Sequence, residues 1–595
     1  MRSLRPFLDA LRARGDLLEV EAPVDPALEL PEIHRRVAAA GGPALFFRRP
    51  TSGAFPVVTN LFGSPERIDL AFGPRPERFV REVVGLAKTI LPPTLGKLWG
   101  ARRLALDALR VGLVTRPSGP VLDVVERPPR LDTLPALTLW PEDGGPFVTL
   151  PLVYTEHPET GQHNLGVYRM QIHGPTTTGM HWQIGKGGGF HYAAAEARGE
   201  ALPATVFLGG PPALILAAIA PLPEPVGELL LASLLLGERL PMVRSPLSPH
   251  RLVAEAEFAL IGRVPPRVRR PEGPFGDHYG YYSLRHDYPV FEVEAIARRR
   301  DAIYPATVVG KPRQEDFYIG DYLQALLAPL FPLVMPTVRD LWSYGETGFH
   351  SLAAAVVADR YPREAMASAF RILGEGQLSL TKVLLVTDAP LDLTDFPGLL
   401  EHLLARVQWE TDLFVIANLS MDTLDYTGPE VNRGSKAILL GLGEAVRELP
   451  RAFSGDLPAD CAGAAVFCGG CLVVAGRPYA EDPEQAARLA RHPAVAAWPL
   501  VVLADDLAPA ASAPRFLWQV FTRFEPAADL HAAAVEVRRH HLCYRGPIVI
   551  DARMKPSYPK EVEPAPETVA LVDRRWREYF PDRDPLDGRR GSRAI

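Results

Sequence analysis

Residues 272–280 of this 595-residue chain are Glu272-Gly-Pro-Phe-Gly-Asp277-His-Tyr-Gly280, which places two carboxylates five positions apart. The glycines and the proline between them predict a rigid turn. Carboxylates that are forced together, or held in an apolar pocket, have raised pKa values and act as general acids near neutral pH. The turn is therefore a candidate catalytic site, although a turn with two solvated acids would have the same composition.

A second polar stretch lies upstream, between Thr149 and His191. It is rich in histidine and ends in Gly187-Gly-Gly189. Backbone N–H groups that glycine leaves accessible bind phosphate oxygens, and a lysine nearby adds charge. The stretch therefore predicts a phosphate or metal–phosphate site. It contains neither a G-x-x-x-x-G-K-[ST] motif nor a G-x-G-x-x-G motif between a strand and a helix, so neither an NTPase nor a dinucleotide fold is indicated.

The spacing of apolar residues and turn residues predicts a mixed α+β chain of four parts. We expect an N-terminal α/β domain over residues 1–120 and a β-rich barrel or sandwich over residues 121–320. Alternating helices and strands return in a C-terminal α/β domain over residues 321–440. Residues 441–595 are expected to hold an inserted partial repeat of that α/β module and a closing segment.

The repeat is predicted from matching spacings. Lys382–Asp388 and Leu500–Asp505 are both apolar strands that end in a carboxylate. An arginine follows each at the same distance, and an Asp-Leu pair follows each arginine at the same distance, as Asp412-Leu413 and Asp529-Leu530. We favour a partial duplication of one α/β module over chance agreement.

Charge and apolar patterning exclude two classes of protein. The net charge is −6, which lacks the strongly basic footprint of a nucleic-acid binder. The N-terminus has no continuous apolar core of a signal peptide. Ala204–Leu222 is long enough to span a membrane, but glycines and prolines interrupt it, so a strand, a turn and a buried helix are favoured. We expect a cytoplasmic protein.

The four cysteines, Cys461, Cys468, Cys471 and Cys543, all lie in the C-terminal part. A single C-x-x-C pair, as in Cys468-Gly-Gly-Cys471, is weak evidence for a metal or redox site. Small buried thiols beside a glycine turn are the favoured interpretation, and a metal or redox role that coexists with another activity is the alternative.

Several stretches together resemble the UbiD family of decarboxylases over nearly the whole chain. The resemblance rests on the turn of residues 272–280 and on the following motifs: Pro23-Val-Asp-Pro26, Thr59-Asn-Leu-Phe-Gly-Ser-Pro-Glu-Arg67, Trp140-Pro-Glu-Asp143, Asn164-Leu-Gly-Val-Tyr-Arg169-Met-Gln171, His181-Trp-Gln183, Lys186-Gly-Gly188 and Asp301-Ala-Ile-Tyr-Pro-Ala-Thr-Val-Val-Gly-Lys-Pro312. It implies that the central part is a split β-barrel of the flavin-reductase type and that the C-terminal α/β domain mediates oligomerisation.

The resemblance also implies site residues. Arg169, Glu272 and Asp277 would form the catalytic network. Asn164, His181 and Glu228 would bind Mn²⁺ together with the phosphate of prenylated FMN, a ligand set with the oxygen donors that a hard cation prefers. Backbone carbonyls of Ala217, Ala218 and Ala220 would bind K⁺. The residues expected to bind prenylated FMN are Thr149, Asn164, Val167, Tyr168, Arg169, His181, Trp182, Gln183, Lys186, Gly187, Glu228 and Lys436. The family's closing motif is split here, so Lys555 is an alternative to Lys436.

The activity that this resemblance implies is non-oxidative, reversible decarboxylation of a hydroxyaryl carboxylic acid. The cofactor would supply the electron sink, and Asp277 would donate a proton while Glu272 and Arg169 tune and orient it. The expected substrate is a quinone-biosynthesis precursor of the polyprenyl-hydroxybenzoate or hydroxynaphthoate type, as in ubiquinone or menaquinone synthesis. A catabolic aromatic (de)carboxylase and a catalytically silent scaffold are the alternatives.

The same resemblance implies partners. A flavin prenyltransferase would supply the cofactor, and a prenylated substrate would bring the enzyme to the membrane surface. A homodimer or homohexamer is expected.

Overall fold

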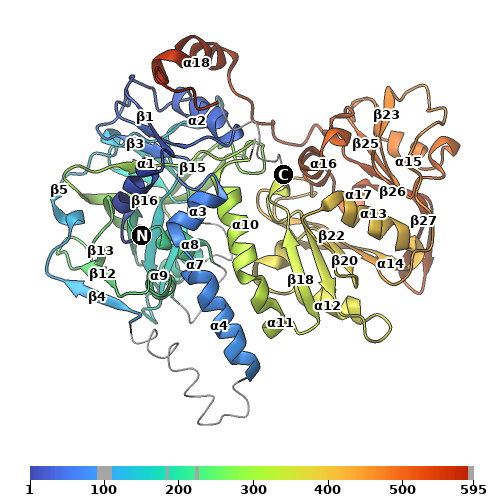
Figure 1. Cartoon of the computed structure of the whole chain (residues 1–595), viewed down its shortest axis with the longest axis horizontal. Helices are drawn as coiled ribbons and strands as arrows, with labels where there is room; N and C mark the ends of the chain where they lie inside the picture. Colours follow the sequence, from blue (N-terminus) through green and yellow to red (C-terminus); the bar gives the residue numbers. More distant parts are fainter. Residues whose placement is uncertain (90–109, 183–186, 221–226, 312, 587–595) are drawn as a thin grey trace. The chain divides into compact units, whose positions relative to one another are not determined.

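The computed structural model describes residues 1–89, 110–182, 187–220, 227–311 and 313–586. The chain forms two compact units, shown as ribbons in Figure 1. The first unit comprises residues 1–326 together with the chain from residue 560 onward, and the second comprises residues 327–559.

The N-terminal part of the first unit is a four-stranded sheet of order β1-β2-β3-β17 with helices around it. Helix α1 forms because its apolar side chains recur at helical spacing: Leu4, Phe7, Leu8 and Leu11 are all buried. Gly15, at φ +67°, ends the helical segment. The elements are α1 (Leu4–Ala13), β1 (Leu17–Val20), α2 (Glu29–Ala39), β2 (Ala44–Phe47), β3 (Val57–Thr59), α3 (Pro65–Phe72), α4 (Arg75–Thr89) and β17 (Tyr304–Pro305).

The central part is a curled, mostly antiparallel sheet that holds ten strands of the described chain. Its main path is β6 (Phe147–Val148), β9 (Met170–Gly174), β10 (Thr177–Gly179), β16 (His286–Arg298), β14 (Phe258–Val264), β11 (Leu202–Leu208), β7 (Leu152–Glu156) and β8 (His163–Val167). Strands β5 (Val124–Glu126) and β15 (Arg269–Glu272) pair with the long strand β16. The predicted β-rich central part is therefore confirmed, as a half-barrel with open ends.

Among the described residues, three helices and a small sheet complete this part. They are α7 (Gly187–Ala197), α8 (Ala213–Ile219), α9 (Glu228–Leu236), β4 (Leu113–Arg116), β12 (Leu240–Val243) and β13 (Leu252–Val253). The long apolar stretch from Ala204 is divided between β11 and α8, as its glycines and prolines predicted.

The second unit consists of two α/β modules, each with one five-stranded sheet. The first module (residues 327–441) contains α11 (Phe331–Val334), β18 (Val338–Ser343), β19 (Leu352–Val357), α12 (Glu364–Leu373), β20 (Val383–Thr387), α13 (Phe396–Arg406), α14 (Trp409–Asp412), β21 (Leu413–Ser420) and β22 (Arg433–Gly441). The second module (residues 463–551) contains β23 (Gly463–Cys468), β24 (Cys471–Ala475), α15 (Gln485–Leu489), β25 (Leu500–Ala504), α16 (Ala513–Phe521), α17 (Pro526–Asp529), β26 (Leu530–Arg538) and β27 (His541–Asp551).

The two modules share one topology. Their strand orders, β18-β19-β20-β22-β21 and β23-β24-β25-β27-β26, have the same sequence of antiparallel and parallel pairs. Even a local detail recurs, because the backbone N–H of Gln408 donates to Asp412 and that of Glu525 donates to Asp529. This agreement supports the duplication inferred from the spacing of the two strands.

Contacts between the modules are reciprocal. Helix α14 of the first module packs against β27 of the second, and α17 of the second packs against β22 of the first. A shared apolar core that includes Phe396, Phe516 and Cys471 joins them. Cys471 lies opposite Cys468 on the β23–β24 hairpin, and burial raises the pKa of its thiol. Both cysteines are free thiols inside this core.

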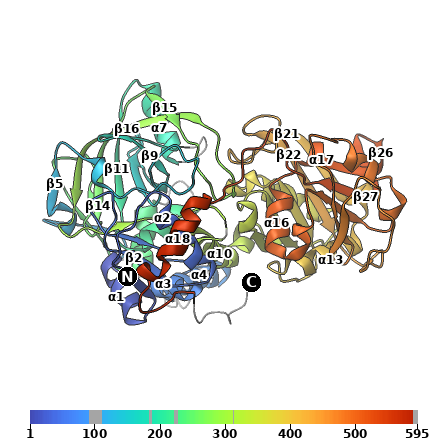
Figure 2. The same ribbon diagram turned by 90° about the horizontal axis from the view of Figure 1, so that it is seen from above.

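The chain after residue 559 returns to the first unit and does not belong with the repeat. Helix α18 (Pro566–Tyr579) lies beside α2, as both views show (Figures 1 and 2). Ion pairs join Arg36 to Asp573 and Arg575 to Glu29. The segment expected over residues 441–595 is thus divided between the two units.

Glu315–Val334, which begins with α10 (Glu315–Leu327), is long and apolar enough to cross a membrane by length and composition alone. Helices of soluble proteins pass the same test, so the segment is weak evidence of membrane contact.

His34 on α2 makes the stability of the fold sensitive to acid. The residue is fully buried, and desolvation together with the charge of Arg35 lowers the pKa of His34 to about 3. The unfolded chain therefore binds a proton below about pH 6.5 that the folded chain does not, and stability falls as the pH decreases from there. In His34→Gln, we expect the free energy of unfolding to decrease less steeply with falling pH, by up to about 1.4 kcal/mol per pH unit. Urea unfolding between pH 7 and pH 5 measures this slope. The exposed His540, replaced by Asn, is the control, and an unchanged slope in His34→Gln would refute the assignment.

Candidate active site

Arg169, Glu272 and Asp277 meet in one buried network. Arg169 lies between β8 and β9, Glu272 ends β15, and Asp277 follows on the turn after β15. The Nε of Arg169 is 3.2 Å from Oε1 of Glu272, and its Nη1 forms an ion pair with Oδ2 of Asp277. The three side chains are 10% or less exposed. One arginine thus holds two carboxylates that the sequence placed on a single turn.

Three further residues accept hydrogen bonds from the backbone of this turn and fix it in place. Asp143 accepts the backbone N–H of Gly276 at 2.8 Å, and Gln171 accepts that of Gly273 at 2.9 Å. The hydroxyl of Ser283 accepts both the backbone N–H of Phe275 and the Nη2 of Arg169. The guanidinium of Arg169 also lies over the ring of Phe275, 4.5 Å from its centroid. Because its donors are used internally, the turn is held in one conformation.

Glu272 and Asp277 are held ionised, contrary to the raised pKa values expected from their proximity. Burial alone would raise the pKa of Asp277, but the charges of Arg169 and His278 outweigh it and lower that pKa. Burial would likewise raise the pKa of Glu272, but the interactions with His181 and Arg169 outweigh burial and lower that pKa. The prediction was wrong because the sequence did not show how close the cations lie. Asp143, which accepts a hydrogen bond from this turn, does have a raised pKa of about 6, because burial exceeds the effect of its backbone hydrogen bonds.

A second polar cluster contains Asn164, Tyr168 and Glu228. The amide of Asn164 donates to Glu228 at 3.0 Å, and the hydroxyl of Tyr168 donates to Asn164 at 3.2 Å. A Cβ at Gly187 would lie 2.5 Å from the amide nitrogen of Asn164, so this position has no room for a side chain. Two oxygen-bearing side chains beside the start of α7 are a donor set that fits a hard cation and a phosphate.

His181 contacts the first cluster through one of its ring nitrogens. Its Nδ1 lies 2.8 Å from Oε1 of Glu272, while its Nε2 is buried and has no hydrogen-bond partner among the described residues. A carboxylate on one ring nitrogen orients the other nitrogen, which is the usual arrangement of a metal-binding histidine. The donor set therefore fits the expected role of His181, although the metal ligands remain a prediction.

The other predicted cofactor residues have varied surroundings. Thr149 is buried and accepts the backbone N–H of Thr307, Val167 is half-buried, and Trp182 is buried with an Nε1 that has no partner among the described residues. Gln183 and Lys186 lie outside the described residues.

Ala217, Ala218 and Ala220 lie in and just after the last turn of α8. The carbonyls of the last turn of a helix lack intrahelical donors, which suits the expected K⁺.

Lys436 and Lys555 both belong to the second unit and both are bonded within it. The Nζ of Lys436 donates to the backbone oxygen of Thr381, and burial lowers the pKa of Lys436 to about 8. The Nζ of Lys555 lies 3.0 Å from Asp529. Lys436 lies within β22, whereas Lys555 follows the end of β27, so the two lysines do not hold corresponding positions in their modules. The choice between them stays open.

Sequence reasoning missed four residues of the network: Asp143, Gln171, His278 and Ser283. Asp143 and Gln171 stand in stretches that were singled out, and His278 is the neighbour of Asp277 in the sequence. Their roles depend on which strands meet, so no local signal distinguished them.

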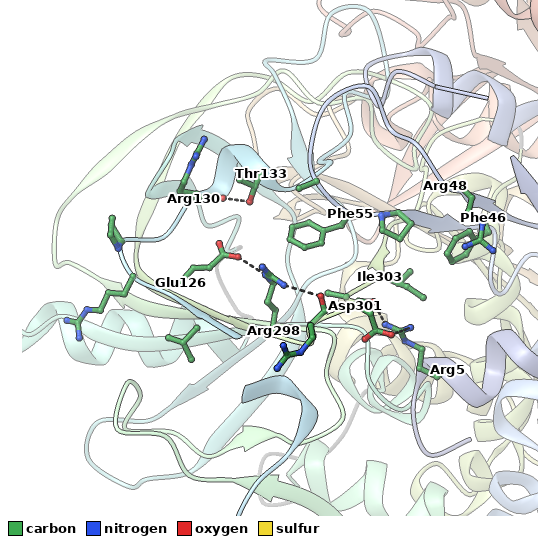
Figure 3. A pocket seen from close by; sticks show the side chains of 17 residues that line it. Arg5, Phe46, Arg48, Phe55, Glu126, Arg130, Thr133, Arg298, Asp301 and Ile303 are labelled. Atoms are coloured by element: carbon green, nitrogen blue, oxygen red, sulfur yellow. Dashed lines mark hydrogen bonds and ion pairs between the residues drawn. The ribbon is translucent and has the colours of Figure 1, made fainter. Parts of the chain in front are cut away.

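A pocket of about 970 Å³ lies elsewhere in the first unit and is drawn in Figure 3. Six arginines and two carboxylates line it, and none of them belongs to the network of Arg169, Glu272 and Asp277. Ion pairs already neutralise several of these arginines, as between Arg298 and Glu126 and between Arg5 and Asp301. The structure gives this pocket no link to the catalytic residues.

Gly276→Ala is expected to displace the catalytic turn. A Cβ at this position would lie 2.0 Å from Cδ1 of Trp140, a buried residue that cannot yield. A shift of the order of 1 Å in a catalytic group costs about 10²-fold in rate, and we expect a loss of that size in kcat. Gly85→Ala, where nothing lies within 4 Å of the new Cβ, is the matched control. Equal kcat values in the two variants would show that the turn is not held as described.

Family models match most of the chain. The models are those of 3-octaprenyl-4-hydroxybenzoate carboxy-lyase: its N-terminal domain matches residues 8–87, its Rift-related domain residues 113–312 and its C-terminal domain residues 317–441. The last match ends with the first α/β module.

Individual relatives and solved structures are also similar to this chain. A Chlamydia pneumoniae protein, named as one of the subunits of 4-hydroxybenzoate decarboxylase, is 50% identical over 585 residues, which cover 98% of this chain and 99% of that protein. The UbiD-class enzyme HmfF from Pelotomaculum thermopropionicum, solved in complex with FMN, is 26% identical with a TM-score of 0.62, over 74% of this chain and 94% of that one. The closed form of Sedimentibacter hydroxybenzoicus vanillic acid decarboxylase shares the fold at 24% identity, with a TM-score of 0.65 over 77% and 96% of the two chains.

Proposed function

This chain belongs to the UbiD family of carboxy-lyases, and on that premise we propose that it decarboxylates a hydroxyaryl carboxylic acid with prenylated FMN. The observation that carries the proposal is the buried network in which Arg169 bridges Glu272 and Asp277. A scaffold protein has no need of such a network, because two buried carboxylates cost free energy unless their charges are compensated.

The chain's own residues would bind the cofactor and its metal. Asn164, Glu228 and the Nε2 of His181 are the proposed Mn²⁺ ligands, and the carbonyls of Ala217, Ala218 and Ala220 are proposed for K⁺. The phosphate would lie near Gly187, where the absence of a side chain leaves backbone N–H groups accessible. When bound, prenylated FMN supplies the electron sink that loss of CO₂ requires.

The catalytic network would act on the proton that replaces the carboxylate. Arg169 holds Oδ2 of Asp277 and so orients Oδ1 for proton transfer. Glu272 keeps Arg169 in place from the other side and accepts a hydrogen bond from His181 when Nδ1 is protonated. Removal of water from this buried site strengthens each of these interactions. Asp277 is the proposed donor of the proton to the carbon that lost CO₂.

The proposed substrate is a 4-hydroxybenzoate-like or hydroxynaphthoate-like precursor of a quinone. The description of the matching family models and the name of the chlamydial relative support this class. The second α/β module resembles the long C-terminal part of family members linked to menaquinone synthesis. A catabolic aromatic (de)carboxylase remains the alternative within the same chemistry.

The test is to purify the protein after co-expression with a flavin prenyltransferase and to determine its bound cofactor and metals by mass. Prenylated FMN with stoichiometric manganese is expected, followed by CO₂ release from members of a hydroxybenzoate and hydroxynaphthoate panel. Asn164→Ala should lose manganese and cofactor together. A protein that cannot be loaded would favour the scaffold alternative.

A further inference from the structure

We propose that His278 delivers the proton that Asp277 gives to the product, taking it from solvent once per turnover. This inference rests on the proposed decarboxylase function and adds to it a route for the proton. His278 is a positioning residue in this scheme, because it contacts Asp277 and not the reacting carbon.

The geometry singles out His278 among the side chains that contact Asp277. Oδ2 of Asp277 faces Arg169, whereas Oδ1 accepts the backbone N–H of His278 at 2.7 Å and lies 2.5 Å from its Nδ1. An arginine does not lose its charge near neutral pH, whereas an imidazole is readily protonated and deprotonated there. The side chain of His278 is 28% exposed and that of Asp277 only 9%, so the ring joins a buried acid to a more accessible surface.

The resting state of Asp277 makes such a route necessary. Arg169 and His278 keep the pKa of this carboxyl low despite its burial, so it carries no proton between turnovers. The reaction R–COO⁻ + H⁺ → R–H + CO₂ consumes one proton for every CO₂ released. In the proposed relay a proton enters at Nε2 of His278 and another leaves from Nδ1 to Oδ1 of Asp277. That proton then bonds to the carbon whose bond to CO₂ has broken, and no electrons are exchanged with any oxidant or reductant.

A second carboxylate supports the charged form of His278. Asp316, near the start of α10, interacts electrostatically with this ring. Its Oδ1 is buried and has no hydrogen-bond partner among the described residues, and burial raises the pKa of Asp316 to about 6. The centroid of the Tyr279 ring lies 5.1 Å from that of His278. Glu315, the first residue of α10, directly precedes Asp316. The imidazolium would therefore interact with two carboxylates, Asp277 by a hydrogen bond and Asp316 through its charge, and both interactions favour its transient protonation.

His278→Gln tests the relay, because glutamine still forms a hydrogen bond but carries no titratable proton. We expect kcat to fall by about 10²-fold, as on loss of a group that transfers protons, with KM and the bound cofactor unchanged. The solvent isotope effect on kcat should rise, since proton delivery becomes limiting, and added imidazole should restore part of the rate. His541→Gln, a half-buried histidine of the second α/β module, is the control. If His278→Gln had the same kcat and the same solvent isotope effect as the wild type, the proposal would be wrong.

Two further measurements keep the test decisive if His278→Gln does not fold. Asp316→Asn leaves the Asp277–His278 hydrogen bond in place and should lower kcat increasingly as the pH rises, and a pH profile identical to wild type would contradict the relay. In protein with ¹⁵N-labelled histidine, one downfield ring N–H is expected that disappears in Asp277→Ala, and its absence in the wild type would also contradict it. Failure of the proposed function is distinct, because the wild type itself would then release no CO₂.

Discussion

Asp277→Asn is expected to lower kcat by about 10²–10⁴-fold, the contribution of a positioned general acid. The amide has nearly the same size as the carboxyl, so the turn and its hydrogen bonds to Asp143 and Ser283 are expected to remain. It cannot pass a proton to the substrate, and its NH₂ group faces the Nη1 of Arg169 or the backbone N–H of His278, both of which are donors. KM should change little, because the loss arises in the transition state.

The measurement is steady-state and single-turnover CO₂ release by protein with verified bound cofactor. Asp69→Asn, an exposed carboxylate on α3, is the control. If Asp277→Asn turned over substrate at the wild-type rate, another group would have to donate the proton, and Asp277 would be left with the role of holding Arg169.

The second large effect is expected from Arg169→Met, which removes the cation between two buried carboxylates. Breaking a buried ion pair by deleting one partner typically costs about 3–5 kcal/mol, because the remaining charge is left uncompensated. Decarboxylation should be lost as well, since neither Glu272 nor Asp277 would keep its orientation. Arg263 is the matched control, because it also lies between two carboxylates, Glu292 and Glu294, but is 55% exposed. Its replacement by Met should cost less than about 1 kcal/mol.

The pH dependence distinguishes the two variants further. In the wild type the lowered pKa of Asp277 contributes stability that is present above its ordinary value and is lost as the pH falls through the folded value. Without Arg169, burial would dominate and raise both carboxyl pKa values, so Arg169→Met should gain stability relative to the wild type as the pH decreases from 7 to 5. If the two arginine variants lost the same free energy of unfolding, or if the loss in Arg169→Met did not depend on pH, the buried network would be contradicted.

Much of the fold was predictable because its signals are local. Helix α1 follows from four apolar residues at helical spacing, and the strands of both modules follow from apolar runs such as Val383–Thr387 and Leu500–Ala504. The shared topology of the two modules could be anticipated because equal distances between charged residues occur in both, although the sequence between them differs. The return of α18 to the first unit could not be predicted, because it depends on contacts with residues more than 500 positions away.

The candidate site was predictable in identity but not in charge. Arg169, Glu272 and Asp277 were named from motifs, and the structure brings them together. The protonation of the carboxylates was predicted wrongly, because their distances from Arg169 and His181 are set by strand pairing, of β9 with β10 and of both β10 and β15 with β16. Asp143 carries a raised pKa for the same reason, since its burial comes from packing beside Trp140 and Gly276.

The central claim is that this protein replaces a carboxylate on an aromatic ring with a proton, and the most direct test is decarboxylation in D₂O. Cofactor-loaded protein would be incubated with hydroxybenzoates and hydroxynaphthoates that carry ¹³C in the carboxyl group. The account predicts release of ¹³CO₂ from at least one of them and a single deuterium at the ring carbon that carried the carboxylate. Bound prenylated FMN with no ¹³CO₂ from any member of the panel, or a product without deuterium at that carbon, would contradict it.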